Sequence, residues 1–223
     1  MIESLLHAIV ARLPPPRVIF DRTGKRPYLS RWYLYPREPQ ESFDAIGRRA
    51  PPRATPPFEI LLHCFHASDD TVSLHSHPWT VAYSVILSGG YLETRRTAYD
   101  VLRLYRRRPG DVVKLETDTF HRVQLFPCEQ CSGAGYLLAG HQERPCVCTR
   151  TNRGVIPSWS LFVAGARCSS WGFWHPVTRL FVPWRSFLDG SGSGSRLDIR
   201  YPHVSPRLPT EWTTGADEAP GST

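Results

Sequence analysis

The sequence predicts an all-β fold, either a sandwich or a barrel. Its 223 residues include 21 prolines and 16 glycines, and punctuation this frequent favours many short strands over long helices. Runs of alternating or apolar β-formers recur along the chain with turn residues between them, whereas only the N-terminus has a helical pattern. The length suits one good-sized domain with flexible additions.

The expected elements follow in chain order. Residues 1–13 form an amphipathic helix candidate that ends at three prolines; Glu3 and His7 interrupt its apolar positions. Because it also lacks a basic region, we expect neither a signal peptide nor a transmembrane span, and hence a cytoplasmic protein. The strands are expected at 28–35, 58–66, 79–87, from 91 onward, and at 100–106, 112–116, 121–126, 158–165 and 169–174, with 182–188 closing the domain.

Three parts are predicted from this pattern. Residues 1–26 hold the N-terminal helix and a linker, and residues 27–188 form the barrel. Within the barrel, residues 127–157 interrupt the strand rhythm as a cysteine-rich insertion without evident strand pairing. Residues 189–223 are rich in glycine and serine and then polar, so we expect a disordered tail.

The net charge of +7 comes almost entirely from arginine. The arginines are spread through the chain, with one triplet at 106–108. Nucleic-acid binding needs basic residues gathered on one face and interleaved with exposed aromatics. This pattern therefore argues against a nucleic-acid partner, which we keep as the weakest alternative.

A pair of histidines precedes one of the expected strands. In a strand, residues two apart point to the same face, so His75 and His77 project together. Extending that alternation gives a large apolar set on the same face: Trp79, Val81, Tyr83, Val85 and Leu87. We therefore expect both histidines to point inward.

A third histidine has the same orientation on another strand, where His121, Val123 and Leu125 alternate with polar residues. Imidazole nitrogen suits zinc, iron, copper and nickel, and three such ligands with open positions are typical of a catalytic metal site. The alternative is three core histidines that hydrogen-bond to their neighbours. Three inward histidines with an H-x-H pair favour the metal.

The segments "HSHPW…VILSGGYLE" and "RPGDVVKLETDTFHRVQL" resemble the two sequence motifs of the cupin superfamily, over roughly residues 58–188. The resemblance implies a double-stranded β-helix, a jelly-roll barrel. It also implies that His75, His77 and His121 are metal ligands, with Gly89 or Gly90 at the turn of the first motif. The closing segment "WSLFVAGARCSSWGFW…FVPWRSF" resembles small, largely uncharacterised bacterial and phage cupin-like proteins.

The usual cupin glutamate is missing. It should fall four or five residues after His77, where Val81 and Ala82 stand. The resemblance therefore implies either a three-histidine site, as in the thiol dioxygenase branch of cupins, or a degenerate site without metal.

Three further residues are pocket candidates. Tyr83 shares the expected inward face and offers a hydroxyl, or is a core tyrosine. His63 and His66 lie on opposite faces of the preceding strand, so at most one faces the pocket. Either is a further ligand, a general base or a hydrogen-bonded polar residue.

The insertion carries four cysteines as C-x2-C followed by C-x-C: Cys128, Cys131, Cys146 and Cys148. The first pair has the spacing of a zinc knuckle, and His141 is an alternative to one of the second pair. Zinc would order a loop of this length. The other readings are incidental thiols or a disulfide within the first pair.

The expected function is that of a cupin-like metal-binding protein, with a metalloenzyme of dioxygenase type as the first hypothesis and isomerase chemistry also open. We expect iron(II) in the barrel, with zinc, manganese and nickel as alternatives, and a structural zinc in the insertion. A non-catalytic ligand- or metal-binding module or scaffold is the alternative. The partner would be a small molecule, and cupins often form homodimers.

Overall fold

The computed structural model describes residues 2–21, 25–36, 57–69, 71–134, 136–139, 142–146, 148 and 154–188. The expected tail at 189–223 lies outside these residues. None of the helices in the described part is long and apolar enough to cross a membrane. The elements are α1 (Ile2–Val10), β1 (Arg17–Phe20), β2 (Pro27–Tyr35), β3 (Phe58–Phe65), β4 (Leu74–His75), β5 (Val81–Ser88), β6 (Tyr91–Arg96), a 3-10 turn (Ala98–Asp100), β7 (Leu102–Arg107), β8 (Val112–Glu116), β9 (His121–Leu125), β10 (Tyr136–Ala139), β11 (Gln142–Pro145), β12 (Ser158–Gly165), β13 (Gly172–Trp174), β14 (Phe181–Pro183) and α2 (Trp184–Leu188).

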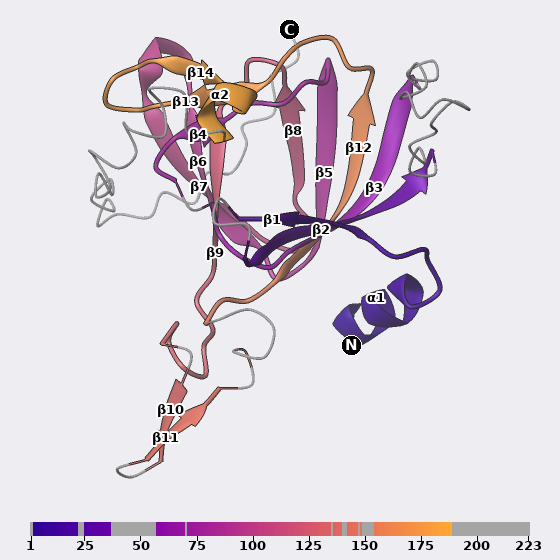
Figure 1. The fold of residues 1–223 in the computed structure, drawn as a ribbon, viewed down its shortest axis with the longest axis vertical. Coiled ribbons are helices and arrows are strands. Elements are labelled where there is room, and N and C mark those ends of the chain that lie inside the picture. Colours follow the sequence, from indigo (N-terminus) through magenta and orange to yellow (C-terminus); the bar gives the residue numbers. More distant parts are fainter. Residues whose placement is uncertain are drawn as a thin grey trace, which may run out of the picture.

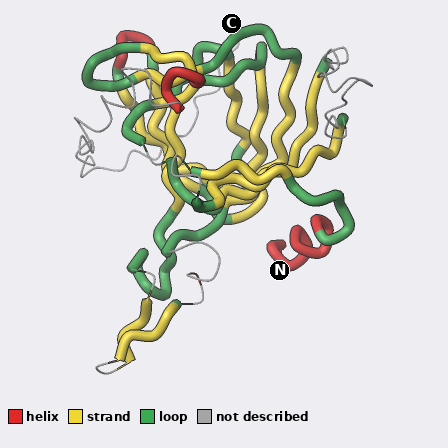
Figure 2. Tube along the Cα trace, viewed as in Figure 1, coloured by secondary structure: helices red, strands yellow, loops and turns green. Residues whose placement is uncertain are grey.

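The described strands form two six-stranded antiparallel sheets and a separate hairpin (Figures 1 and 2). One sheet has the order β1-β2-β3-β12-β5-β8 and the other β14-β13-β4-β9-β6-β7. Four strands of the first sheet have the order β3-β12-β5-β8, and four strands of the second have the order β4-β9-β6-β7. This is the strand order of a jelly roll, in which the chain passes repeatedly from one sheet to the other. The predicted double-stranded β-helix is confirmed by this order.

The first sheet is apolar on both faces, and this explains why the N-terminal helix packs against it. Leu61 and Phe162 belong to a core cluster that also holds Trp79. Leu62, on the opposite face of β3, packs with Trp159 and with Leu6 of α1. Helix α1 therefore covers the outer face of the sheet and leaves the inner face to the barrel interior.

The alternation predicted through residues 79–87 is correct for Trp79, which lines the cavity, but is shifted by one position along β5. On β5 the buried residues are Ala82, Ser84, Ile86 and Ser88, while Tyr83 is 42% exposed. The reason is that His75 ends β4 in one sheet and Val81 begins β5 in the other. The chain changes sheets at the intervening proline, so the period of two does not carry across. Tyr83 therefore faces away from the pocket.

The insertion is more regular than the sequence suggested. Strands β10 and β11 pair antiparallel, with Tyr136 opposite Pro145 and Ala139 opposite Gln142. The expectation of a loop without strand pairing is therefore wrong. Figure 1 shows this hairpin projecting from the barrel at the end of β9.

Candidate metal centre

Three histidines from the β4 and β9 region meet inside the barrel. His75 is directly opposite His121 in the register of these two strands, and His77 lies in the crossover that follows β4. Their ligand nitrogens all lie within 4.8 Å of one another, and the Nε2 atoms of His77 and His121 are 2.9 Å apart. Two nitrogens at zinc-bonding distance and at right angles around a metal would be separated by about 3 Å. The spacing therefore fits a shared ion.

A buried glutamate orients His121. The Nδ1 atom of His121 donates to Glu93 Oε1 at 2.7 Å. Glu93 has no exposed side-chain surface and also accepts hydrogen bonds from Arg95 Nη2 and Arg107 Nε, both at 2.8 Å. A proton held on Nδ1 leaves the lone pair on Nε2 directed at the other histidines. Glu93 thus fixes the tautomer that binds metal.

Neighbouring groups keep the Glu93 carboxyl in its ionised form. Burial alone would raise the pKa of this carboxyl, but the His121 hydrogen bond and the two guanidinium groups lower it far below its usual value. Glu93 is therefore ionised, and the groups that donate hydrogen bonds to it are two guanidiniums and one imidazole. It acts on the site through His121 and is not itself among the clustered ligands.

A second carboxylate, that of Asp69, lies near the Nδ1 atom of His75. Asp69 Oδ2 lies 3.5 Å from His75 Nδ1, and the carboxylate also accepts from the Val123 amide at 2.6 Å and from the Tyr28 hydroxyl. Burial tends to raise the pKa of Asp69, but His75 and these donors lower it overall. Two of the three histidines therefore have a carboxylate beside Nδ1, an arrangement common around metal-binding histidines.

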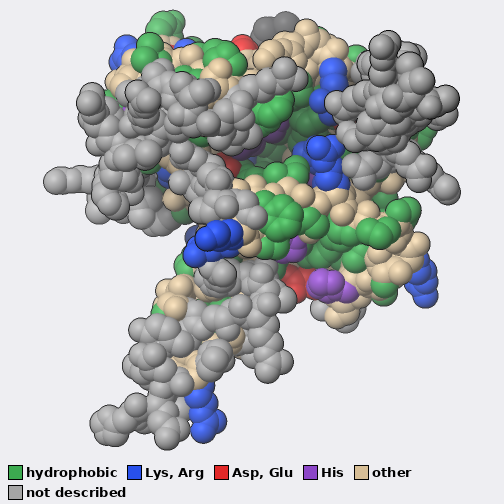
Figure 3. Space-filling model, viewed as in Figure 1, with side chains coloured by type: hydrophobic (Ala, Val, Ile, Leu, Met, Phe, Trp, Pro, Cys, Tyr) green, Lys and Arg blue, Asp and Glu red, His purple; other side chains and the backbone are tan. Residues whose placement is uncertain are grey.

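The histidines open onto a cavity of about 670 Å³. Its walls are mostly apolar and include Trp79, Phe162 and Phe173 beside the three histidines. Figure 3 shows a hollow on this face, with histidine atoms within it and basic side chains beside it. A cavity of this size and lining is typical of small-molecule sites.

Of the pocket candidates His63 and His66, only one lines the cavity, as the alternation along the strand predicts. His63 lines the cavity, whereas His66 is absent from the lining and bonds Ser30 Oγ through Nε2 at 2.8 Å. Burial, followed by neighbouring positive charge, lowers the pKa of His63 and of His77 well below the usual value. Both rings are therefore neutral at physiological pH.

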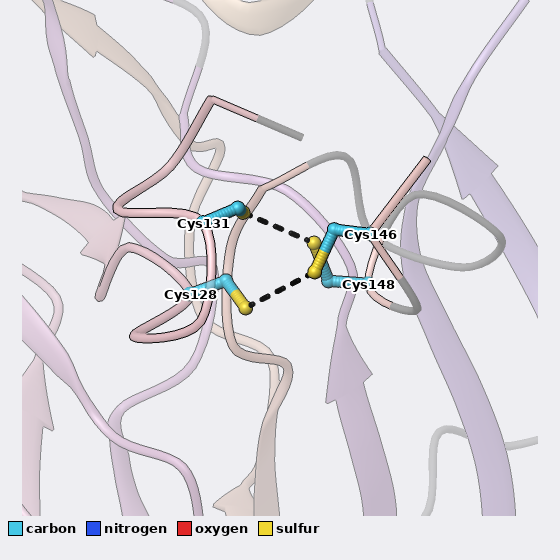
Figure 4. Close-up of side chains that lie close together, drawn as sticks. All are labelled: Cys128, Cys131, Cys146 and Cys148. Carbon is cyan, nitrogen blue, oxygen red and sulfur yellow. Dashed lines mark hydrogen bonds between the residues drawn. The ribbon is translucent and has the colours of Figure 1, made fainter. Parts of the chain in front are cut away.

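The four cysteines of the insertion also converge (Figure 4). All four Sγ atoms lie within 4.8 Å of one another; Cys128 and Cys146 are 4.0 Å apart, and Cys131 and Cys148 are 3.5 Å apart. Four sulfurs tetrahedrally bound at about 2.3 Å from zinc are separated by about 3.8 Å. The distances fit that geometry. All four thiols are free, so the first pair forms no disulfide.

The protonation of this cluster has a consequence for metal binding. Burial and hydrogen bonds to Cys146, Cys131 and Cys128 raise the pKa of the Cys148 thiol to about 12. The thiolate is the ligand form, so metal binding would release protons and depend on pH. The alternative ligand His141 lies outside the described residues.

Comparison with known proteins found solved structures of low identity and low TM-score. No family model matches the sequence, and no curated protein matches it. A solved structure of oxalate oxidase with glycolate is 12% identical over 52% of this chain and 45% of its own, with a TM-score of 0.32. Oxalate decarboxylase from Bacillus subtilis, described with Mn(II) centres, is 14% identical over 64% and 26%, with a TM-score of 0.35. An uncharacterised Klebsiella pneumoniae protein with a double-stranded β-helix domain is 11% identical over 54% and 77%, with a TM-score of 0.31.

This chain spans less than half the length of the oxalate oxidase chain it matches. The class that its own strand order and site define is a jelly-roll barrel with an inward-facing histidine cluster. The cupin resemblance of the two motifs therefore holds at the level of the fold.

Two carboxylates of this site escaped the sequence analysis. Glu93 shares a strand face with Tyr91 and is fully buried with it. An acidic residue at a buried strand position is rare unless it is paired, and that was the available signal. Asp69 carried no such signal, because it stands in a turn.

Replacing Glu93 with glutamine is expected to weaken metal binding about 10- to 100-fold, because the fixed tautomer of His121 loses its ionised acceptor. The change should also lower the free energy of unfolding by about 3 kcal/mol, because Arg95 and Arg107 lose their buried counter-charge. Competitive metal titration and urea unfolding measure the two effects. Glu116→Gln, a surface control at a residue that pairs with Lys114, should change neither. Unaltered metal affinity in Glu93→Gln would refute the orienting role.

Proposed function

We propose that this protein is a metal-dependent enzyme that acts on a small molecule inside its barrel, with iron(II) dioxygenase chemistry as the reaction type. The observation that carries the proposal is the cluster of His75, His77 and His121 at the wall of the cavity. Three imidazoles leave positions around a metal for substrate and dioxygen. An iron(II) ion bound there would supply a redox centre and a Lewis acid.

The protein's own groups would prepare the reaction in three ways. Glu93 and Asp69 lie at the Nδ1 atoms of His121 and His75 and would orient these two ligand rings. Trp79 and Phe162 contact the His77 side of the cluster, with ring centroids 5.6 Å and 6.2 Å from His77. These apolar walls would exclude water and strengthen electrostatic interactions within the cavity.

The insertion supports a second, structural metal. We propose that Cys128, Cys131, Cys146 and Cys148 hold zinc, which would tie the segment after β9 to the segment after β11. A structural zinc uses a closed set of four ligands, and four thiolates are a common set. This site would order the hairpin without taking part in the chemistry.

A non-catalytic module is the second candidate, and the projecting hairpin favours it. A barrel that holds a small ligand or a metal, with an arm that reaches away from it, suits a sensor or scaffold. The absence of a carboxylate among the clustered barrel ligands in the described chain is compatible with this reading. A homodimer and a cytoplasmic location stay predictions.

Oxygen uptake separates the two candidates. Protein reconstituted anaerobically with iron(II) is expected to consume dioxygen when a panel of small carboxylic acids, thiols and alcohols is added. His121→Ala, loaded in the same way, should show at most one hundredth of that rate. Substrate-dependent uptake that is equal in the variant would contradict the proposed site, and ligand binding without any uptake would favour the non-catalytic module. An oxygen electrode with mass spectrometry of the products gives the readout.

A further inference from the structure

One arginine in the cavity wall has no carboxylate partner in the described part of the chain. Arg31, on β2, lines the cavity, and no carboxylate oxygen among the described residues lies within 4.0 Å of it. Its Nε donates to His63 Nε2 at 3.1 Å, and Tyr33 is its other hydrogen-bonding neighbour. Burial lowers the pKa of this guanidinium, which the more distant Glu59 opposes only in part.

Three other arginines of the barrel differ in this respect. Arg95 and Arg107 each pair with Glu93 at 2.8 Å, and Arg167, also in the cavity lining, contacts Glu59 at 3.5 Å. A partly buried guanidinium without a nearby counter-charge is less favourable than a paired one. The cavity therefore contains a positive charge that an anion would stabilise.

The hydrogen-bond partner of Arg31 and one histidine of the cluster both lie next to the ring of Phe162. His63, the partner of Arg31, stacks on Phe162 with ring centroids 4.9 Å apart. His77 lies beside the same ring, with centroids 6.2 Å apart. A ligand bound at Arg31 would thus extend over Phe162 toward the cluster.

The hydrogen bond to His63 restricts the Arg31 guanidinium to an orientation that suits a planar anion. Because His63 Nε2 accepts from Arg31 Nε, the proton of this neutral imidazole is on Nδ1. The Nε contact restrains the plane of the guanidinium, which has five N–H donors and so keeps further donors beyond those that engage His63 and Tyr33. Paired N–H donors in one plane match the two oxygens of a carboxylate.

We propose that Arg31 is a carboxylate-binding residue positioned by His63, so that the substrate of this cavity is a small carboxylic acid with an apolar body. The assignment rests on the proposed function only for the use of the cavity as a substrate site. The aromatic walls select the apolar body. A dication in the histidine cluster would add positive charge and favour the same class.

The experiment compares benzoate with benzamide, which share size and shape but differ in charge. Isothermal titration calorimetry of the full chain should show benzoate binding at least tenfold more tightly than benzamide. Arg31→Gln is expected to abolish that preference and leave benzamide affinity unchanged. Arg103→Gln, an exposed arginine outside the cavity, should retain it. His63→Ala should reduce the preference severalfold, because the guanidinium is no longer held.

The design keeps the outcomes distinct. If Arg31→Gln fails to fold, as judged by circular dichroism, Arg31→Lys replaces it in the comparison. Lysine keeps the positive charge but lacks the paired N–H donors of the guanidinium. Titrations are run on chelator-treated and metal-loaded protein. A benzoate preference in the chelator-treated form supports the carboxylate site even if the metal proposal fails. Metal binding without any preference for benzoate in the wild type, or a preference unchanged in Arg31→Gln, overturns the carboxylate site alone.

Discussion

The loss of one equivalent of divalent transition metal is the expected result of replacing His75, His77 and His121 together with alanine. Their ligand nitrogens lie within 4.8 Å of one another, and no other described residues supply a ligand set inside the barrel. Elemental analysis of protein purified without chelator, and again after reconstitution with iron(II), measures the loss. His66→Asn, which alters a histidine outside the cavity lining, serves as the control and should bind metal normally.

The same ions should stabilise the wild-type fold and not the triple variant. A ligand present at 100 times its dissociation constant adds about 2.7 kcal/mol to the free energy of unfolding. Metal addition should therefore raise the melting temperature of the wild type by several degrees and leave the triple variant unchanged. An equal rise in both proteins would place the stabilising ion elsewhere.

Replacing Cys128 and Cys131 with serine is expected to remove a second metal equivalent, zinc, and to loosen the insertion. The thiol cluster joins the start of the insertion to the segment beyond β11. Binding free energies of structural zinc in small peptides are about 10–16 kcal/mol, so its loss should deprive the hairpin of its main source of order. Zinc release measured with a thiol-blocking reagent, together with limited proteolysis, follows both effects.

The barrel itself should survive this change, because the hairpin projects away from it (Figure 1). The melting temperature of the barrel and its metal content should match those of the wild type. Cys168→Ser is the matched control, since Cys168 is exposed and lies outside the cluster. Zinc content that persists in the Cys128/Cys131 double variant would contradict the structural zinc site.

The positions of several strands could be predicted from the sequence, because strand formation depends on the local pattern of residues. The segment 112–116 coincides with β8 and 158–165 with β12, since alternation and flanking turn residues are local signals. Strand order is not local. The jelly roll was reached through the resemblance of two motifs, and the hairpin β10–β11 was missed because it lacks strong β-formers on its second strand.

The histidines show how a correct expectation can follow from an imperfect argument. His75 and His77 do meet His121, yet the alternation used to align them with residues 79–87 fails beyond Trp79. A chain that crosses between sheets resets its side-chain parity, and no local pattern records the crossing. Tyr83 was misplaced for this reason, whereas the parity of His63 and His66 within one continuous strand was sound.

The residues behind the site depend on contacts far apart in the sequence. Glu93 reaches a histidine 28 positions later, and Asp69 is held by an amide 54 positions later. Arg31 meets His63 only because β2 pairs with β3 in a register that places them opposite each other. Such partners are set by strand register, which a single sequence does not specify.

Anomalous diffraction from a crystal of the native protein tests the metal centre most directly. Data collected on both sides of the iron and zinc absorption edges should show one peak among the Nε2 atoms of the barrel histidines and a second peak, at the zinc edge, among the four cysteine sulfurs. The barrel peak should vanish in the His75/His77/His121 triple variant while the zinc peak stays. A native crystal with no anomalous peak at the three histidines, grown from metal-replete protein, would contradict the proposed metal centre.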